Sequence, residues 1–305
     1  MSRYSISDAD RKPLPASYTR ESRHLGWRED ELERPFAHFY ADAVAPIQRH
    51  VREALSNPGV AAEFGYDVVD AVSHLSRPGY GKLETGWTRT DRGMYQIACF
   101  TDMPGVTAEM WDWWFGWHAT DTARYKLWHP EAHAYSDAGE DRSGDRTLSY
   151  RQRYIGNVSY IDEYLGTDLQ RLTVRFIDPR RLGFDDVPGT THICARVGLS
   201  ELPMAAGWLV HQVRATEHGA EMRSRFWLGD GEILRLPPTS VSNQRAAAVM
   251  TSRIGRAALQ PALPRLVGRL ANRTMAVDIL AHCAQEMNHL AQFLPGLFEE
   301  FKDMP

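Results

Sequence analysis

The hydrophobic and polar positions of this chain follow a helical period near its N-terminus. Apolar side chains recur at helical spacing between residues 28 and 56, and a second, shorter stretch of this kind spans residues 61–76. Proline–glycine pairs at residues 58–59 and 78–79 end the two stretches, because this dipeptide favours turns. The pattern therefore predicts a small helical N-terminal domain over residues 1–80.

After this region the pattern of apolar and polar residues changes from helical to β-type. Residues 83–89 and 95–101 are short β-type runs, and the Thr-Asp-Arg-Gly stretch between them, at residues 90–93, is a hairpin signal. Five further β-type segments follow, at residues 147–164, 169–177, 191–199, 207–216 and 220–229. The pattern predicts about seven antiparallel strands.

One helical region interrupts these strands. Residues 107–128 are predicted to form a single helix, and the aromatic rings of residues 111–118 surround it, which indicates burial against the sheet or in a cavity wall. His129 is expected to end this helix because the residue before a proline, here Pro130, disfavours the α region. Residues 136–146 are rich in Asp, Gly and Ser and are expected to form a mobile loop.

The chain ends in further helices after residue 243, including a long apolar-periodic one. We therefore expect an α+β fold, in which a curved antiparallel sheet of about seven strands grips the long C-terminal helix. The space between the sheet and the helix would be a cavity suited to a small apolar or phenolic ligand. We expect this second domain to span residues 81–305.

Composition and charge narrow the classes of function. The 305 residues carry a formal net charge of −4, and this near balance argues against nucleic-acid binding, which usually requires a basic face. No apolar run approaches the ~20 residues that span a bilayer, and the polar N-terminus does not resemble a signal peptide. We expect a cytoplasmic protein with no nucleic-acid or membrane partner. The sequence does not decide the oligomeric state, and a homodimer is our working expectation.

The most informative polar pattern is His282-Cys-Ala-Gln-Glu286, inside the long C-terminal helix. Residues four apart share one face of a helix, so an imidazole and a carboxylate at this spacing can reach one metal ion. A solvated pair is the common alternative, but the small and apolar neighbours of this pair indicate that it lies against a core. His289 offers a competing Glu-x-x-His pairing, which di-iron bundles use as two copies, and the sequence has no second copy.

Further ligands have to come from the rest of the chain. His129 and His133 are four apart, but Pro130 interrupts any continuous helix through both, so only one is expected to bind. His129 lies at the rigid end of the aromatic helix, whereas His133 lies nearer the loop and is expected to support the site or to contact substrate. Asp162 and Glu163 face opposite sides of a predicted strand, and spacing alone does not choose between them.

Several of these motifs resemble one known family. They are Met103-Pro-Gly, the tryptophan-rich block that ends at His118, residues 124–133 and the terminal His-x-x-x-Glu. Over residues 76–287 the chain resembles the diacetylphloroglucinol hydrolase family, with its relative phloretin hydrolase. The resemblance implies a zinc hydrolase that cleaves the carbon–carbon bond between an acyl group and a phenolic ring. It also implies a helix-grip catalytic domain like that of the birch pollen allergen, after a small helical domain.

The family's zinc site of two histidines and two glutamates carries over onto His129, Glu163, His282 and Glu286, with one zinc per chain. The resemblance therefore selects Glu163 over Asp162.

The resemblance also implies contacts to the substrate, which the family holds with tyrosine hydroxyls, an asparagine and a histidine. His211 fits the histidine and is expected to donate a proton or polarise an oxygen, with Glu163 as the second catalytic residue. The expected substrate contacts are Tyr125, His133, Trp117 and Phe226. Phe226 and Ala132 stand where the family has its tyrosine and asparagine, which leaves room for a different substrate, with Tyr125, Tyr160 and Tyr164 as replacement anchors.

The expected substrate is a small phenolic ketone whose ring hydroxyls stabilise the departing ring carbon as an enolate. Two alternatives use the same cavity. A non-catalytic carrier of phenolic or polyketide ligands needs no buried His/Glu cluster, and a metal-dependent cyclase or decarboxylase would give other products.

Overall fold

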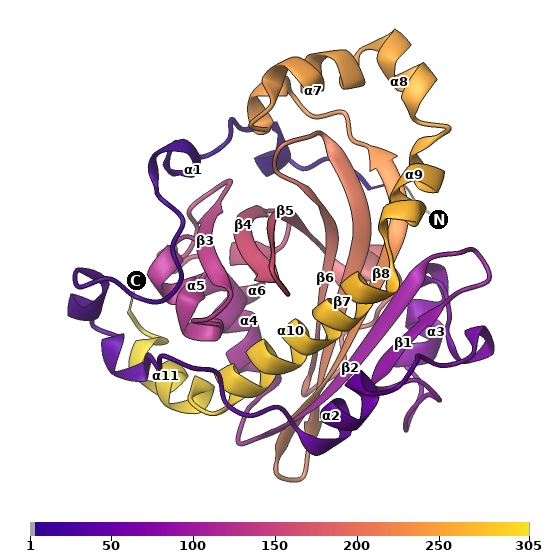
Figure 1. Ribbon diagram of the computed structural model, residues 1–305. Coiled ribbons are helices and arrows are strands. Elements are labelled where there is room, and N and C mark those ends of the chain that lie inside the picture. Colours follow the sequence, from indigo (N-terminus) through magenta and orange to yellow (C-terminus); the bar gives the residue numbers. More distant parts are fainter. Residues whose placement is uncertain (1–3, 305) are drawn as a thin grey trace.

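The centre of the molecule is one antiparallel sheet, seen in a computed structural model that describes residues 4–304 (Figure 1). Within these residues the sheet has eight strands in the order β1-β2-β8-β7-β6-β5-β4-β3. Hairpins therefore join most sequential neighbours, while β8 returns to pair with β2. The strands are β1 Gly86–Arg89, β2 Tyr95–Pro104, β3 His133–Ala138, β4 Val158–Leu165, β5 Asp168–Ile177, β6 Thr190–Leu199, β7 Met204–Thr216 and β8 Gly219–Ile233.

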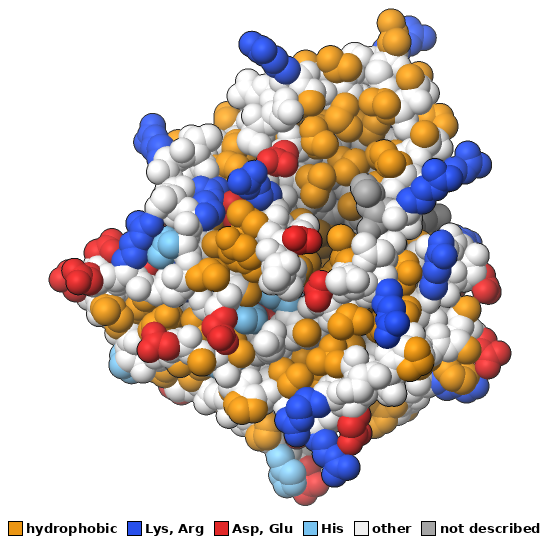
Figure 2. All heavy atoms as spheres, viewed as in Figure 1, with side chains coloured by type: hydrophobic (Ala, Val, Ile, Leu, Met, Phe, Trp, Pro, Cys, Tyr) orange, Lys and Arg blue, Asp and Glu red, His pale blue; other side chains and the backbone are white. Residues whose placement is uncertain are grey.

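A long helix, α10 (Arg273–Ala291), runs diagonally across one face of this sheet and contacts β1, β2 and β4 (Figure 1). Asn272 begins it by accepting a hydrogen bond from the Met275 amide. The other helices are α1 Ser17–Arg20, α2 Arg49–Leu55, α3 Ala71–Leu75, α4 Ala108–Trp117, α5 Thr122–Trp128, α6 Tyr150–Tyr154, α7 Gln244–Thr251, α8 Arg253–Leu259, α9 Leu263–Leu270 and α11 Leu294–Phe301. Hydrophobic side chains gather on the visible surface of α7, α8 and α9 (Figure 2).

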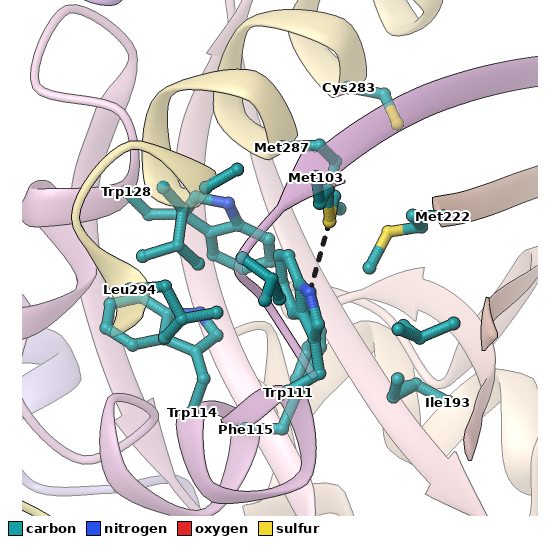
Figure 3. Close-up of a cluster of buried hydrophobic side chains, with 14 of the residues drawn as sticks. Met103, Trp111, Trp114, Phe115, Trp128, Ile193, Met222, Cys283, Met287 and Leu294 are labelled. Carbon is teal, nitrogen blue, oxygen red and sulfur yellow. Dashed lines mark hydrogen bonds between the residues drawn. The ribbon is translucent and has the colours of Figure 1, made fainter. Parts of the chain in front are cut away.

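The main core lies between α10, the sheet and the aromatic helix α4. Trp111 and Trp114 of α4 are fully buried there with Met287 of α10, and the Trp111 indole donates a hydrogen bond to the Met103 sulfur at 3.2 Å (Figure 3). Phe36 and Val51 from the N-terminal region join the same core. The division into two domains at residue 80 remains a prediction.

The hairpin at residues 83–101, four of the five later strands and the long C-terminal helix lie where the sequence predicts them. The one or two helices expected over residues 28–56 are confirmed only at α2, because short 3-10 turns replace the rest. Pro35 and Pro46 each lack the amide hydrogen that a continuous helix needs. Residues 61–76 likewise form 3-10 turns and the short α3.

Two further expectations are wrong in the region that carries the site. The single helix over residues 107–128 is two helices, because Asp121 caps α5 by accepting hydrogen bonds from the Ala123 and Arg124 amides. The loop expected at residues 136–146 begins as β3, which raises the number of strands to eight within the described residues. A capping box between Ser149 and Gln152 begins α6 inside the expected first part of β4.

Candidate metal centre and the cavity beside it

Four side chains converge beneath α10, and each presents a metal-binding atom. The Nε2 atoms of His133 and His282 are 3.3 Å apart. The nearest Glu163 oxygen lies 3.8 Å from the first and 3.7 Å from the second, and the nearest Glu286 oxygen lies 3.6 and 3.7 Å from them. Ligand atoms of His133, Glu163 and His282 all lie within 4.8 Å of one another, so one ion could bind all three.

The fold explains why residues so distant in sequence meet here. His133 is the first residue of β3 and is the direct cross-strand partner of Glu163 on β4, so both side chains emerge on the same face. His282 and Glu286 are one turn apart on α10, which lies over this face. Two pairs, one from the sheet and one from the helix, therefore form the group.

Hydrogen bonds orient both imidazoles. The Nδ1–H of His133 donates to the Tyr125 carbonyl at 2.9 Å, and the backbone of Tyr164 accepts a hydrogen bond from His282. Burial lowers the pKa of His282 to about 4 and that of His133 well below its usual range, so both rings are neutral at pH 7. Each neutral ring then directs an unprotonated Nε2 at the other, and a backbone carbonyl that fixes the ring in this way is typical of metal-ligating histidines.

Burial also favours the uncharged forms of the two carboxyl groups. Burial raises the pKa of Glu163 to about 7, although a hydrogen bond from the Tyr125 hydroxyl opposes the shift. Burial and the nearby charge of Glu163 raise the pKa of Glu286 well above its usual range. A divalent cation would pair with all four acceptors, and imidazole nitrogens and carboxylate oxygens are ordinary ligands of such ions.

His129, the expected fourth ligand, lies outside this group, and His133 occupies that place. The His129 ring stacks on His282 with centroids 4.9 Å apart, and its Nε2 lies 3.4 Å from the Gln285 side-chain oxygen. His129 is the expected ligand because it lies at the rigid end of the aromatic helix, whereas His133 lies nearer the loop expected at residues 136–146. The six residues of β3, His-Ala-Tyr-Ser-Asp-Ala, do not alternate strictly between polar and apolar, so the sequence carries no clear strand signal that would favour His133.

Asp162 and Glu163 point to opposite sides of β4. Glu163 faces α10, whereas buried Asp162 accepts a hydrogen bond from the Arg23 guanidinium at 2.6 Å on the other side. The residue that the resemblance selected is therefore the one that lies in the group.

A cavity of about 330 Å³ opens beside the four acceptors, between α10 and the sheet. Glu163, His282 and Glu286 form part of its wall. Most of the remaining wall is apolar, and it includes Phe115, Ile161, Leu172, Phe176, Val197, Leu209 and Phe226. A largely apolar cavity with a few polar groups at one end is typical of a small-molecule site.

Three of the five sequence-predicted contacts line this cavity and two do not. His133 belongs to the group of four acceptors and is not among the lining residues. Tyr125, His211 and Phe226 lie in the wall. Trp117 lies elsewhere, stacked on Trp113 with ring centroids 5.0 Å apart in the aromatic core. The replacement anchors Tyr160 and Tyr164 are not among the lining residues either.

His118, which was not among the predicted site residues, also lines the cavity. Its Nδ1–H donates to the Trp114 carbonyl at 2.7 Å, so in the neutral ring Nε2 is a hydrogen-bond acceptor. Burial lowers its pKa to about 3. Its position four residues after Trp114, on the same face of the aromatic helix, is a signal that the sequence contains.

His118 also belongs to a column of parallel rings that ends at the candidate metal centre. Trp114 and His118 stack with centroids 4.6 Å apart, and His118 and Tyr125 follow at 5.9 Å. Tyr125 and His133 stack at 3.7 Å with 5° between their planes. We call these four rings the ring column, and it connects His133 to the aromatic core.

Among the described residues, no helix is long and apolar enough to cross a membrane.

Comparison with known proteins places the chain in a family. A 2,4-diacetylphloroglucinol hydrolase of Pseudomonas protegens is 27% identical over 278 residues, which cover 88% of this chain and 85% of that protein. Phloretin hydrolase of Eubacterium ramulus is 26% identical over 288 residues, covering 92% of this chain and 94% of that protein. The profile of the DAPG hydrolase PhiG domain matches residues 67–299, and the chain therefore belongs to the DAPG hydrolase family.

Proposed function

We propose that this protein is a zinc-dependent hydrolase that cleaves the bond between an acyl carbon and a polyhydroxylated aromatic ring. The observation that carries the proposal is the convergence of four buried acceptors, with no positive group among them, of which three form part of the wall of an apolar cavity. The names of the relatives support the substrate class, an acylphloroglucinol or a related phenolic ketone. The position of α10 across the sheet supports the helix-grip architecture that the resemblance implies.

In this proposal His133, Glu163, His282 and Glu286 hold the metal ion, with His133 in place of His129. A zinc ion in such a site, when bound, lowers the pKa of water and polarises a carbonyl. The two carboxylates balance its charge, so that a ketone can enter without an excess of positive charge in the apolar cavity.

The reaction adds water across one carbon–carbon bond. The acyl carbon gains the hydroxyl and becomes a carboxylic acid, and the ring carbon gains a hydrogen. A ring carbon leaves readily only when ring hydroxyls can take up its electrons as an enolate, so the protein has to hold those hydroxyls and supply a proton.

Tyr125 is suited to hold the proton. Burial and the charges of Glu163 and Glu286 raise the pKa of its hydroxyl well above the usual range, so it stays protonated at neutral pH. The hydroxyl donates to Glu163 and lies in the cavity wall. A proton is thus kept in the cavity wall, next to the Glu163 carboxylate.

His211 and His118 are suited to hold ring oxygens, and both lie near the Phe115 ring. The ring centroids of His211 and Phe115 are 6.3 Å apart, and those of His118 and Phe115 are 5.5 Å apart. Burial lowers the pKa of His211 to about 3, so it acts as a neutral hydrogen-bonding group and not as an imidazolium acid. Its Nδ1 shares a hydrogen bond with the Ser224 hydroxyl at 2.7 Å, and when that hydroxyl donates, Nε2–H of His211 is free to bind an oxygen. His118 supplies the complementary acceptor for a phenolic hydroxyl.

The test is a panel of acylphloroglucinols given to the metal-loaded protein, read by loss of the aryl-ketone absorbance and by detection of the carboxylic acid. Acetophenone, which lacks ring hydroxyls, serves as the control substrate. We expect cleavage of the trihydroxy ketones only. No acid product from any member of the panel, by protein that contains one metal ion per chain, would refute the proposal.

A further inference from the structure

One surface of the molecule has a composition that the proposed reaction does not explain. From Gln244 to Val277, a stretch that contains α7, α8 and α9, the sequence has six arginines and no aspartate or glutamate. The protein as a whole has an excess of acidic residues, with a formal net charge of −4. The positive charge is therefore concentrated on this segment, which we call the arginine segment.

The arginine segment also exposes large apolar side chains. Val249, Ile254, Leu259 and Leu266 are 63%, 83%, 42% and 55% exposed. They are four of the eleven exposed large apolar residues found in residues 4–304, and they lie within 18 consecutive positions. Figure 2 shows the apolar surface over α7, α8 and α9, with basic side chains projecting around it. Such a concentration on one surface indicates a binding site and not the usual scatter of exposed residues.

Five of the six guanidinium groups of the segment have no ion-pair partner among residues 4–304, and the sixth, that of Arg273, lies over the Trp87 ring. In the described part of the chain, no carboxylate lies within 4.0 Å of the guanidinium groups of Arg245, Arg253, Arg256, Arg265 or Arg269. Five arginines without ion-pair partners, around apolar side chains, make a surface complementary to one that is both apolar and anionic.

A groove beside α9 adds a second cationic feature. Arg265 and Arg269 line it together with Arg89 and Arg92 of the β1–β2 hairpin region. Its two aspartates already have partners, since Asp67 pairs with Arg92 at 2.9 Å and Asp230 accepts a hydrogen bond from the Trp208 indole at 2.7 Å. The groove is thus positively charged, as a phosphate group requires.

The inner side of the same segment forms part of the cavity wall. Val267 of α9, together with Ala271 and Met275, lines the cavity beside the candidate metal centre. The outer surface of α9 carries Leu266 and two of the arginines that line the groove. The arginine segment therefore separates the apolar cavity from whatever binds its outer surface.

We propose that the arginine segment docks on an anionic lipid surface, with Ile254 and its apolar neighbours in the interface and the arginines against lipid phosphates. This revises the expectation of no membrane partner, which rested on the lack of a spanning segment. A second copy of the chain is a poorer occupant, because a two-fold interface would place this arginine-rich surface against itself. An apolar phenolic ketone dissolved in a bilayer would then be close to the cavity wall.

The test uses the full chain and vesicles, and it needs no activity. Flotation with vesicles of phosphatidylcholine alone is compared with vesicles that also contain phosphatidylglycerol. We expect binding only to the second kind, weakened by added salt because the attraction is partly electrostatic. Equal binding to both kinds, or binding to neither, would overturn the proposal.

Two matched variants assign the binding to this surface. Ile254→Asp, and separately the pair Arg253→Glu with Arg256→Glu, should weaken vesicle binding by about tenfold or more. Val187→Asp, at a position that is 52% exposed in the acidic loop before β6, should bind as wild type does. Thermal unfolding checks that each variant folds. If Ile254→Asp instead converts a dimer into a monomer and leaves vesicle binding unchanged, the surface is a subunit interface and the lipid proposal is wrong.

Discussion

The two faces of the sheet carry buried charge in opposite ways. On the face away from α10, Arg223 and Arg225 both bind Glu84, with nitrogen–oxygen distances of 2.7 and 2.5 Å. Burial alone would raise the pKa of Glu84, but the hydrogen bond from Arg223 and the two positive charges lower it to about 2. On the cavity face, burial raises the pKa of Glu163 to about 7, and no arginine or lysine approaches it among the described residues within 4.0 Å.

The difference shows which polar cluster is complete in the protein alone. A buried carboxylate is stable in its ionised form only when a positive charge or several donors face it. Glu84 has both, so its network is closed. Glu163 and Glu286 face each other and two neutral imidazoles, so they need either protons or a cation from outside the chain.

Among the substitutions that test the difference between the Glu84 network and the Glu163 group, the removal of a proposed metal ligand should have the largest effect. His133→Ala should lose most of the bound metal and roughly 10³-fold or more in activity, because a metal ion supplies several kcal/mol of transition-state stabilisation. His129→Ala is the matched control at a neighbouring, equally buried histidine, and it should keep the metal. Elemental analysis of both purified variants decides. Loss of metal from His129→Ala alone would return the fourth position to His129.

Removal of His211 should affect the rate and leave the metal in place. His211→Ala should lower kcat by roughly 10²-fold, which is typical for the loss of one donor to a developing negative charge. Because its pKa is about 3, its titration should leave no step in the rate between pH 5 and 8. A variant that loses metal in proportion to activity would show that His211 acts on the centre instead.

The ion-pair network of Glu84 with Arg223 and Arg225 predicts a pH-dependent change in the free energy of unfolding. Glu84→Gln should lower the free energy of unfolding by about 2 kcal/mol at neutral pH. The pKa of Glu84 is lower in the folded state than its ordinary value of 4.5, so its contribution is present above pH 4.5 and is lost as pH falls towards 2. Urea unfolding of the two proteins at several pH values should therefore give curves that approach each other in acid. A difference that stays constant down to pH 3 would argue against this explanation.

The smallest expected effect concerns His118. His118→Phe keeps a ring in the ring column but removes the acceptor, and KM should rise about five- to tenfold, the worth of one hydrogen bond. The rise should occur for substrates with a free ring hydroxyl and vanish for their O-methyl ethers. Equal changes for both kinds of substrate would mean that the ring only packs.

The fold could be predicted where local pattern decides it. The hairpin turn at residues 90–93, the period-2 strands and the apolar period of α10 are all readable in the sequence, and each is confirmed. The break between α4 and α5 was not predicted, since it depends on a capping side chain, Asp121, inside a continuous helical pattern.

The candidate site shows the same limit. Two of its four members share one helical turn, which made them visible as a motif. The other two are cross-strand partners, and their pairing depends on a strand, β3, that is only six residues long. A register of this kind is set by tertiary packing, so the choice between His129 and His133 could not be made from spacing.

The order of the four residues along the chain has a consequence for biosynthesis. His133 and Glu163 are made well before His282 and Glu286, which follow Glu163 by 119 and 123 positions. A nascent chain therefore carries only half of the centre until α10 has been made, and half a centre should hold an ion weakly. An ion that binds the finished protein would fasten the last long helix to the sheet, and its free energy of binding would count as free energy of folding.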